Sequence, residues 1–407
     1  MGSAPMRVVI AGGGVATLEA ALALRELAEE RVDVDLLAPE PVYWYRPLAV
    51  AEPFGLGAVQ AVEVADVAAA AGAQFSLAAL GAVDLELRCA WSAEGARFDY
   101  DALVVACGTR SEPVVPGALT FRGPADTEWF RRVLEELDEG TVRRLVFAAP
   151  GGPVWPLPLY ELALLTAAYL KARDVEAELV LVTPEEGPLH VFGYEASAAL
   201  RQLLDERGIE FRGGSFPLAF EEGELATAVR GRVAADRVIA LPRLRGVAID
   251  GLPHDRDGFL AVDRHGRVLG APGVYAAGDI TSFSVKQGGL ASQQADAVAE
   301  AIAASAGAPI RPRPFQPVLR GLLLTGGIPA YLRTPLLAGG AADARVAVEP
   351  LWWPPAKIAA RRLSPFLASL AMHPSVANAI PVELEVGAPL GGSVDPTDAD
   401  GPAAAER

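Results

Sequence analysis

The sequence predicts an α/β fold with two Rossmann-like βαβ domains and a small C-terminal cap. Two stretches support this prediction, one over residues 6–40 and one over residues 144–185. Each runs from a short apolar strand through a glycine-containing turn into a helix, and on to a second strand. With 407 residues, the chain is long enough for two or three domains with cores of their own.

The first stretch has a glycine-rich turn between strand and helix. Residues 7–11 form a β-branched, apolar run typical of a buried parallel strand, and residues 15–30 have the pattern of an amphipathic helix. Gly12 permits the tight turn, and Gly14 lets the backbone approach a pyrophosphate. This group would lie on the N–H groups and the positive dipole of the helix N-terminus.

The ligand expected at this turn is a dinucleotide. Val15 and Ala16 open the helix, so their N–H groups belong to the expected pyrophosphate site. Thr17 replaces the third glycine of the usual fingerprint and costs some closeness of helix–strand packing. The second strand, residues 34–37, ends near Glu40, which is suitably spaced to accept ribose hydroxyls. The alternative is an ordinary α/β unit with a glycine turn.

Composition excludes several classes of function. The net charge of −16 argues against a nucleic-acid partner, because phosphate binding needs clustered lysine and arginine. The first five residues do not resemble a secretory signal, and no apolar run reaches the roughly 18 residues of a membrane span. The cytoplasm is therefore the expected location. The only cysteines, Cys89 and Cys107, lack the spacing of a zinc ribbon, an iron–sulfur cluster or a redox dithiol, and no metal site is predicted.

Two later segments carry a resemblance to a known family. Residues 100–109 read YDALVVACGT and resemble the "YDxLVxATG" segment of flavoproteins with two dinucleotide domains, and residues 273–280 look like their second FAD motif, "VYAAGD". With the N-terminal turn, three motifs occur in the family's order. Over about residues 6–330, the chain resembles FAD-dependent pyridine nucleotide-disulfide oxidoreductases. It is most similar to the branch of sulfide:quinone oxidoreductases, flavocytochrome c sulfide dehydrogenases and type II NADH dehydrogenases.

The resemblance implies a bound FAD and names further residues that would hold it. Ala106 and Gly108 lie in the first motif, and a backbone group near Leu80 would meet the adenine. In the second motif, Gly278 lets the backbone approach the ribityl region. Asp279 would accept a hydrogen bond from a ribityl or phosphate-adjacent hydroxyl.

The flavin ring itself is expected at two other segments. Arg46 lies in an aromatic loop similar to the family's "Y-x-R-P" loop and would reach a phosphate or a flavin edge; otherwise the loop is a proline-rigidified surface turn. Gln287 and Gly288 open a helix over residues 290–304 that would point at the flavin N1/O2 edge. Lys286, as a catalytic candidate, would stabilise negative charge on the reduced ring. Its alternative role is a solvated lysine at a helix start.

The second βαβ stretch is where the resemblance places NAD(P)H. Its strands are predicted at residues 144–149 and 178–183, with a helix at 160–172 between them. The turn at residues 150–159 carries four prolines, which removes N–H donors that a pyrophosphate needs. Glu185 after the second strand favours such a site, because an acidic residue at this position can accept ribose hydroxyls. Binding of NAD(P)H therefore stays open.

Two more catalytic candidates lie beside this turn. No cysteine occurs there, which argues against the persulfide chemistry of sulfide:quinone oxidoreductases. Trp155 would wall off the flavin face, or else is a structural residue between domains. Glu161 aligns with a family glutamate near the flavin and is interpreted as a proton relay or as a charge complementing the helix dipole.

The domain organisation follows from these segments. The expected units are a discontinuous FAD domain, a middle domain, a C-terminal cap and a disordered tail, at residues 5–112 with 243–316, 113–242, 317–386 and 387–407. In the cap, Trp352 and Trp353 precede a basic amphipathic stretch at residues 356–370, interrupted by Pro365. The stretch is interpreted as a homodimer contact or a cover over the flavin. The alternative is a peripheral contact with a membrane surface.

The leading functional prediction is an FAD-dependent oxidoreductase. It would take electrons from a small-molecule donor and pass them to a quinone-like or other diffusible acceptor. One alternative is an NAD(P)H dehydrogenase with an atypical nicotinamide site. Another is a flavin-binding protein without turnover that acts as a scaffold or partner-binding module.

Overall fold

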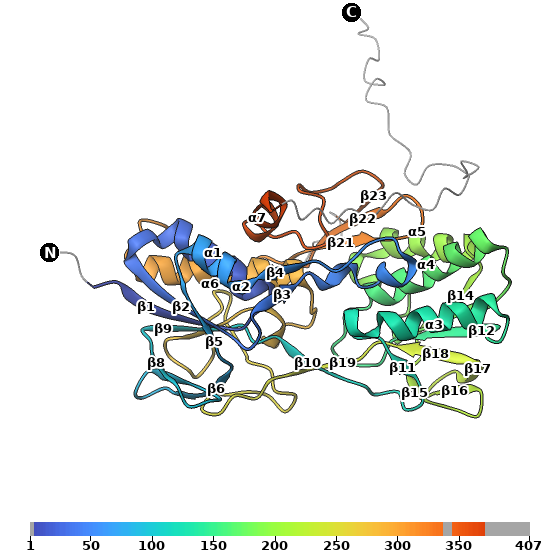
Figure 1. Ribbon diagram of the computed structural model, residues 1–407, viewed down its shortest axis with the longest axis horizontal. Helices are drawn as coiled ribbons and strands as arrows, with labels where there is room; N and C mark the ends of the chain where they lie inside the picture. Colours follow the sequence, from blue (N-terminus) through green and yellow to red (C-terminus); the bar gives the residue numbers. More distant parts are fainter. Residues whose placement is uncertain (1–3, 337–343, 371–407) are drawn as a thin grey trace, which may run out of the picture.

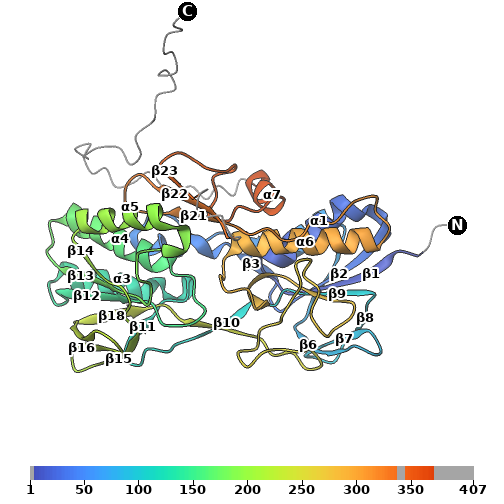
Figure 2. The same ribbon diagram turned by 180° about the vertical axis from the view of Figure 1, so that it is seen from behind.

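The computed structural model describes residues 4–336 and 344–370. Two five-stranded parallel sheets lie toward opposite ends of the long axis, and a small antiparallel sheet packs above and between them (Figures 1 and 2). The predicted α/β fold with two Rossmann-like units is confirmed. The predicted tail at 387–407 and residues 371–386 of the predicted cap lie outside the described residues.

The first sheet has the strand order β20-β9-β1-β2-β5 and all its pairs are parallel. Apolar side chains bury β9 completely, as expected for a central strand covered on both faces. Helices α1 and α6 pack along one another on one face of the sheet (Figure 1). The bounds are β1 Met6–Ala11, α1 Val15–Ala28, β2 Val32–Ala38, β5 Gln74–Leu77, β9 Ala102–Val105, β20 Val274–Ala276 and α6 Gly288–Ser305.

The second sheet has the order β11-β18-β12-β13-β14, again all parallel. Its bounds are β11 Leu119–Thr120, α3 Thr127–Asp138, β12 Arg144–Ala148, α4 Leu157–Arg173, β13 Glu178–Val182, α5 Tyr194–Glu206, β14 Ile209–Arg212 and β18 Arg237–Ala240. Two antiparallel strands, β10 Thr109–Glu112 and β19 Arg243–Gly246, connect the two units.

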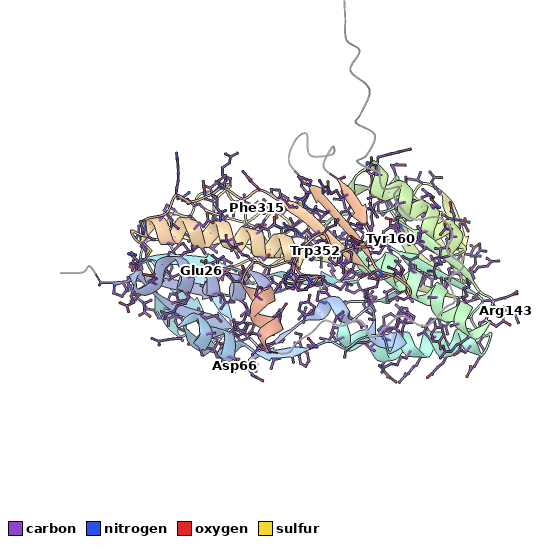
Figure 3. All side chains as sticks on the ribbon, turned by 90° about the horizontal axis from the view of Figure 1, so that it is seen from above. Glu26, Asp66, Arg143, Tyr160, Phe315 and Trp352 are labelled. Carbon is purple, nitrogen blue, oxygen red and sulfur yellow. The ribbon has the colours of Figure 1, made fainter. Side chains whose placement is uncertain are left out.

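Smaller elements complete the fold. The C-terminal sheet consists of β21, β22 and β23, and seen from above it lies between the two larger units (Figure 3). The remaining bounds are β3 Val42–Trp44, β4 Ala61–Glu63, α2 Val64–Ala71, β6 Leu80–Asp84, β7 Cys89–Ser92, β8 Arg97–Asp99, β15 Pro217–Glu221, β16 Glu224–Thr227, β17 Gly231–Ala234, β21 Val318–Leu323, β22 Ala330–Pro335, β23 Arg345–Ala347 and α7 Leu363–Ser369.

The basic stretch at residues 356–370 differs from its prediction. Only α7 is helical, and Pro365 lies inside its first turn instead of interrupting it, because a proline there needs no intrahelical N–H partner. Lys357 and Arg362 are buried and form ion pairs. Of the basic residues of this stretch, Arg361 is exposed. No helix among the described residues has the length and apolar character needed to span a bilayer.

Candidate functional site

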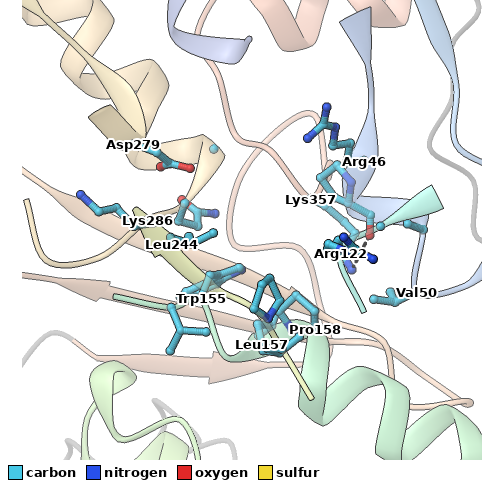
Figure 4. A pocket seen from close by; sticks show the side chains of 18 of the residues that line it. Arg46, Val50, Arg122, Trp155, Leu157, Pro158, Leu244, Asp279, Lys286 and Lys357 are labelled. Atoms are coloured by element: carbon cyan, nitrogen blue, oxygen red, sulfur yellow. Dashed lines mark hydrogen bonds between the residues drawn. The ribbon is translucent and has the colours of Figure 1, made fainter. Parts of the chain in front are cut away.

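A cavity lies where the two sheets meet the C-terminal segment. Its volume is about 300 Å³, at the lower end of the range for small-molecule sites (roughly 300 to 1,000 Å³). It brings together seven of the predicted site residues from distant parts of the chain (Figure 4). They are Arg46, Trp155, Glu161, Asp279, Lys286, Gln287 and Gly288.

The glycine turn lies outside this cavity lining, at the end of β1. Gly12 has φ +142°, and a Cβ there would meet the carbonyl oxygen of Ala106 at 2.2 Å. A Cβ at Gly14 would meet nothing within 4 Å. No side chain caps α1 after Gly14, and its first turn carries no acidic residue. The N–H groups of Val15 and Ala16 therefore belong to an uncapped helix N-terminus suited to an anion.

The other predicted residues of the nucleotide half lie beyond the ends of neighbouring strands. Ala106 donates its N–H to the carbonyl of Ala11 at 2.7 Å, and Gly108 has φ +70° with open space where a Cβ would be. Glu40 is exposed in the turn after β2, and Leu80 is half-buried at the start of β6. Carboxyl ends of parallel strands are where dinucleotides bind in such sheets.

The second motif turns the chain from β20 toward the cavity. Gly278 has φ +81°, donates its N–H to Gln294 Oε1 at 2.7 Å, and a Cβ on it would meet the Ala16 side chain at 3.1 Å. Asp279 follows and lines the cavity. Burial raises the pKa of Asp279 to about 6, although Lys286 opposes the shift. A buried carboxylate of this kind favours a hydroxyl donor as ligand.

Lys286 is 3% exposed, so its predicted alternative as a solvated lysine is wrong. Its ammonium group donates to the carbonyl oxygen of Thr281 and lies 4.0 Å from the centre of the Phe259 ring. Burial lowers the pKa of Lys286 to about 8, while Asp279 acts against the shift. The side chain therefore carries a titratable positive charge at the cavity wall.

Gln287 and Gly288 form the N-terminus of α6. The Gln287 side chain accepts the N–H of Leu290 at 2.9 Å and donates to the carbonyl of Arg320 at 3.1 Å. Gly288 packs closely on Ile358, which a Cβ would meet at 3.1 Å. The helix end is thus tied to both the C-terminal sheet and the C-terminal segment.

Two further buried charges of the cavity are Glu161 on α4 and Lys357 from the C-terminal segment. Lys357 Nζ lies 2.7 Å from each carboxylate oxygen of Glu161. The Lys357 side chain is 4% exposed and the Glu161 side chain is 1% exposed. Leu324 donates its N–H to Glu161 at 2.9 Å, and Lys357 also donates to the Pro47 carbonyl at 3.1 Å. Burial raises the pKa of Glu161 and lowers the pKa of Lys357, and the partner opposes the shift in each case. Each charge is therefore stabilised by its partner against the cost of burial.

The position of Glu161 in α4 bears on one of its two interpretations. α4 begins at Leu157, so Glu161 lies in its second turn, beyond the reach of the first-turn dipole effect. The interpretation as a charge that complements the dipole is wrong. Its partner Lys357 was missed by the sequence, since it is 196 residues away and no local pattern joins the two.

Trp155 lies between this cavity and a smaller one of about 190 Å³ beside the proline-rich turn. Its ring packs 6.0 Å from that of Phe192. Glu185 lines the smaller cavity, but its carboxylate already accepts hydrogen bonds from within the protein. Its Oε2 accepts hydrogen bonds from Tyr160 Oη at 2.7 Å and from Thr183 Oγ1 at 3.3 Å.

Glu185 makes the stability of the protein depend on pH. Burial raises the pKa of Glu185 from 4.5 to about 7, against its hydrogen bonds from Tyr160 and Thr183. The folded protein therefore binds this proton more tightly than the unfolded chain does. The resulting stabilisation is complete below pH 4.5 and is lost as pH rises to about 7. It amounts to about 3 kcal/mol of unfolding free energy.

We expect Glu185→Gln to remove this contribution, because glutamine does not titrate. Urea unfolding at about pH 5 and about pH 7.5 should show a smaller difference in the variant than in the wild type. Glu19, whose pKa burial also raises to about 7, remains in both proteins as an internal reference. An unchanged difference would contradict the protonated state of Glu185.

The residues at the edge of the first sheet fit an FAD. An uncapped helix N-terminus accommodates a pyrophosphate, and the open space at Gly14 and Gly108 leaves room for it. Thr17 Oγ1, in the first turn of α1, is buried without a hydrogen-bond partner. Asp279 adds a buried carboxylate, and Arg46 adds a guanidinium that pairs with no carboxylate in the described parts of the chain.

The chain matches known proteins over most of its length. The model of the family described as pyridine nucleotide-disulphide oxidoreductase matches residues 6–301. An NADH dehydrogenase-like protein of Mycobacterium tuberculosis is 28% identical over 294 residues, which cover 68% of this chain and 73% of that protein.

Solved structures share the fold at lower identity. The sulfide:quinone oxidoreductase of Aquifex aeolicus aligns with a TM-score of 0.70 and 19% identity, over 81% of this chain and 83% of that one. A ferredoxin reductase of Rhodopseudomonas palustris aligns with a TM-score of 0.61 and 19% identity, over 82% and 83%.

Proposed function

Because the chain belongs to the pyridine nucleotide-disulphide oxidoreductase family, we propose that it binds FAD and transfers electrons from a small donor to a quinone-like or other diffusible acceptor. FAD would be held by the β1–α1 turn, the segment around Asp279 and the N-terminus of α6. When bound, it supplies the exchange of two electrons together with a proton. Lys286 would favour the reduced, more negative state through its positive charge.

The observation that carries this proposal is the Glu161–Lys357 pair in the cavity wall. A quinone becomes a hydroquinone by taking up two electrons and two protons, so one proton must come from an acid beside the acceptor. Lys357 lies in the cavity wall beside Glu161, and burial lowers its pKa, which suits general acid catalysis. Lys357 would donate to the acceptor oxygen, and Glu161 would hold the ammonium in place.

Two features disfavour NAD(P)H as the donor. The carboxylate of Glu185, which would have to accept ribose hydroxyls, already accepts hydrogen bonds from Tyr160 and Thr183. Pro156 caps α4 and Pro158 occupies its first turn, so the helix end offers fewer N–H groups to a pyrophosphate. Both features support a donor other than a nicotinamide.

The test is an anaerobic titration of the FAD-loaded protein with NADH and then NADPH, followed by the visible flavin band. We expect neither nucleotide to bleach the band, whereas the photoreduced protein should be reoxidised by a quinone. Bleaching by either nucleotide would instead make the protein an NAD(P)H dehydrogenase with an unusual turn. Turnover with any donor and acceptor would eliminate the scaffold alternative. A protein that takes up no FAD would refute the proposal.

A further inference from the structure

Three arginines stand in register across the C-terminal sheet. Arg320 on β21 pairs with Arg333 on β22, and Arg333 pairs with Arg345 on β23. Directly paired residues of an antiparallel sheet point to the same face, so the three guanidinium groups form one row. We call these three residues the arginine row. Like charges placed directly opposite destabilise a sheet unless an anion lies beside them.

Within residues 4–336 and 344–370, no carboxylate compensates the arginine row. None of its three guanidinium groups forms an ion pair or a hydrogen bond there, whereas Arg313 and Arg362 both pair with carboxylates. Burial and the neighbouring Arg333 lower the pKa of Arg320. The row is therefore an unbalanced positive feature on a chain whose net charge is −16.

The row leads from the surface into the cavity. Arg345 is exposed on β23, Arg333 is half-buried, and Arg320 lines the cavity. Figure 1 shows β21 nearest the body of the molecule and β23 farthest out. The opposite face of the same sheet packs into the core through Leu319 and Leu323, so the arginine row lies on the other face.

Most other charged side chains of the cavity already have a binding partner. The lining contains five cationic side chains, at Arg46, Arg122, Lys286, Arg320 and Lys357, and two carboxylates, at Glu161 and Asp279. Lys357 is paired with Glu161, Lys286 is held by the Thr281 carbonyl, and Arg122 lies 3.8 Å from Asp126. Arg46 is the proposed partner of FAD. Arg320 is thus the guanidinium left for another ligand.

We propose that the arginine row recognises an oxyanion group, such as a carboxylate, phosphate or sulfonate, on the electron acceptor that enters this cavity. Arg320 binds the group with two parallel hydrogen bonds. Arg333 and Arg345 attract the anion from solution and speed its entry. This inference rests on the proposed function and adds the chemical class of the acceptor: a quinone-like molecule with a negative charge.

The test compares two acceptors with the same ring system on the FAD-loaded protein. Anthraquinone-2-sulfonate carries one negative charge, and 2-(hydroxymethyl)anthraquinone carries none. Equilibrium dialysis with the oxidised protein gives the dissociation constant of each. Stopped-flow reoxidation of the photoreduced protein gives the second-order rate constants at low and high salt. Arg320→Gln removes the guanidinium group that is proposed to bind the anion, and Arg320→Lys keeps the positive charge but cannot form two parallel hydrogen bonds. The control variant, Arg232→Gln, removes a surface charge on the β16–β17 hairpin that pairs with Glu224 at 3.1 Å.

We expect Arg320→Gln to weaken binding of the sulfonate about tenfold or more relative to its effect on the uncharged quinone. Arg320→Lys should recover part of this loss, and Arg232→Gln should cause none. The rate with the sulfonate should fall with salt more steeply in the wild type than in Arg345→Gln.

Equal effects of Arg320→Gln on both acceptors would overturn the inference while leaving the proposed function intact. An effect of Arg345→Gln alone would also overturn it, because Arg320 would then not bind the anionic group. Absence of flavin uptake would refute the proposed function itself.

Discussion

Replacing Lys357 by methionine is expected to lower the free energy of unfolding by about 3–5 kcal/mol. The reason is the position of Glu161, whose side chain is 1% exposed and loses the ammonium group with which it pairs. Glu161→Gln leaves the Lys357 ammonium unpaired and should cost a similar amount. Urea unfolding of the two single variants measures both effects.

The double variant Glu161→Gln, Lys357→Met separates stability from chemistry. It removes both charges of the pair together, so most of the stability should return. Reoxidation of the photoreduced protein by a quinone should stay about 100-fold or more below the wild type, because the proposed acid, Lys357, is absent. If the double variant regained full reoxidation, the pair would be a structural ion pair and the proposed proton transfer would be wrong.

The second large effect is expected at Gly12. A Cβ there would lie 2.2 Å from the carbonyl oxygen of Ala106 and 2.7 Å from Thr17 Oγ1, and φ is +142°. The first of these neighbours is backbone and does not move aside. Gly12→Ala should therefore destabilise the protein by about 3–5 kcal/mol even without FAD, from backbone strain together with overpacking.

Gly14→Ala is the matched control, because the same methyl group meets nothing within 4 Å. We expect unfolding without FAD to change by less than about 1 kcal/mol. Its FAD affinity should still fall, by roughly tenfold or more, because the methyl group occupies the approach of the pyrophosphate. Urea unfolding and a flavin fluorescence titration measure the two quantities. Equal loss of stability in both variants would contradict the geometry of the turn, and an unchanged affinity for Gly14→Ala would contradict its place at the pyrophosphate.

Local sequence patterns were sufficient for most elements of the two βαβ units. The strand at residues 7–11, the glycine turn and the helix from Val15 depend on neighbours in the chain, so hydrophobic periodicity and turn chemistry predict them. The turn between β6 and β7 has a local cause as well. Asp84 accepts the N–H groups of Glu86 and Leu87 and closes a turn between β6 and β7.

What the sequence alone determined is the fold class, the family and the residue types available near a flavin. The tertiary structure decided which of these residues meet. Lys286 is buried against Phe259, Glu161 pairs with a lysine 196 residues away, and the arginine row exists only through the register of three strands. Each of these depends on burial or on pairing between segments distant in the chain. Such contacts follow from packing of the whole molecule and leave no periodic signal in any one segment.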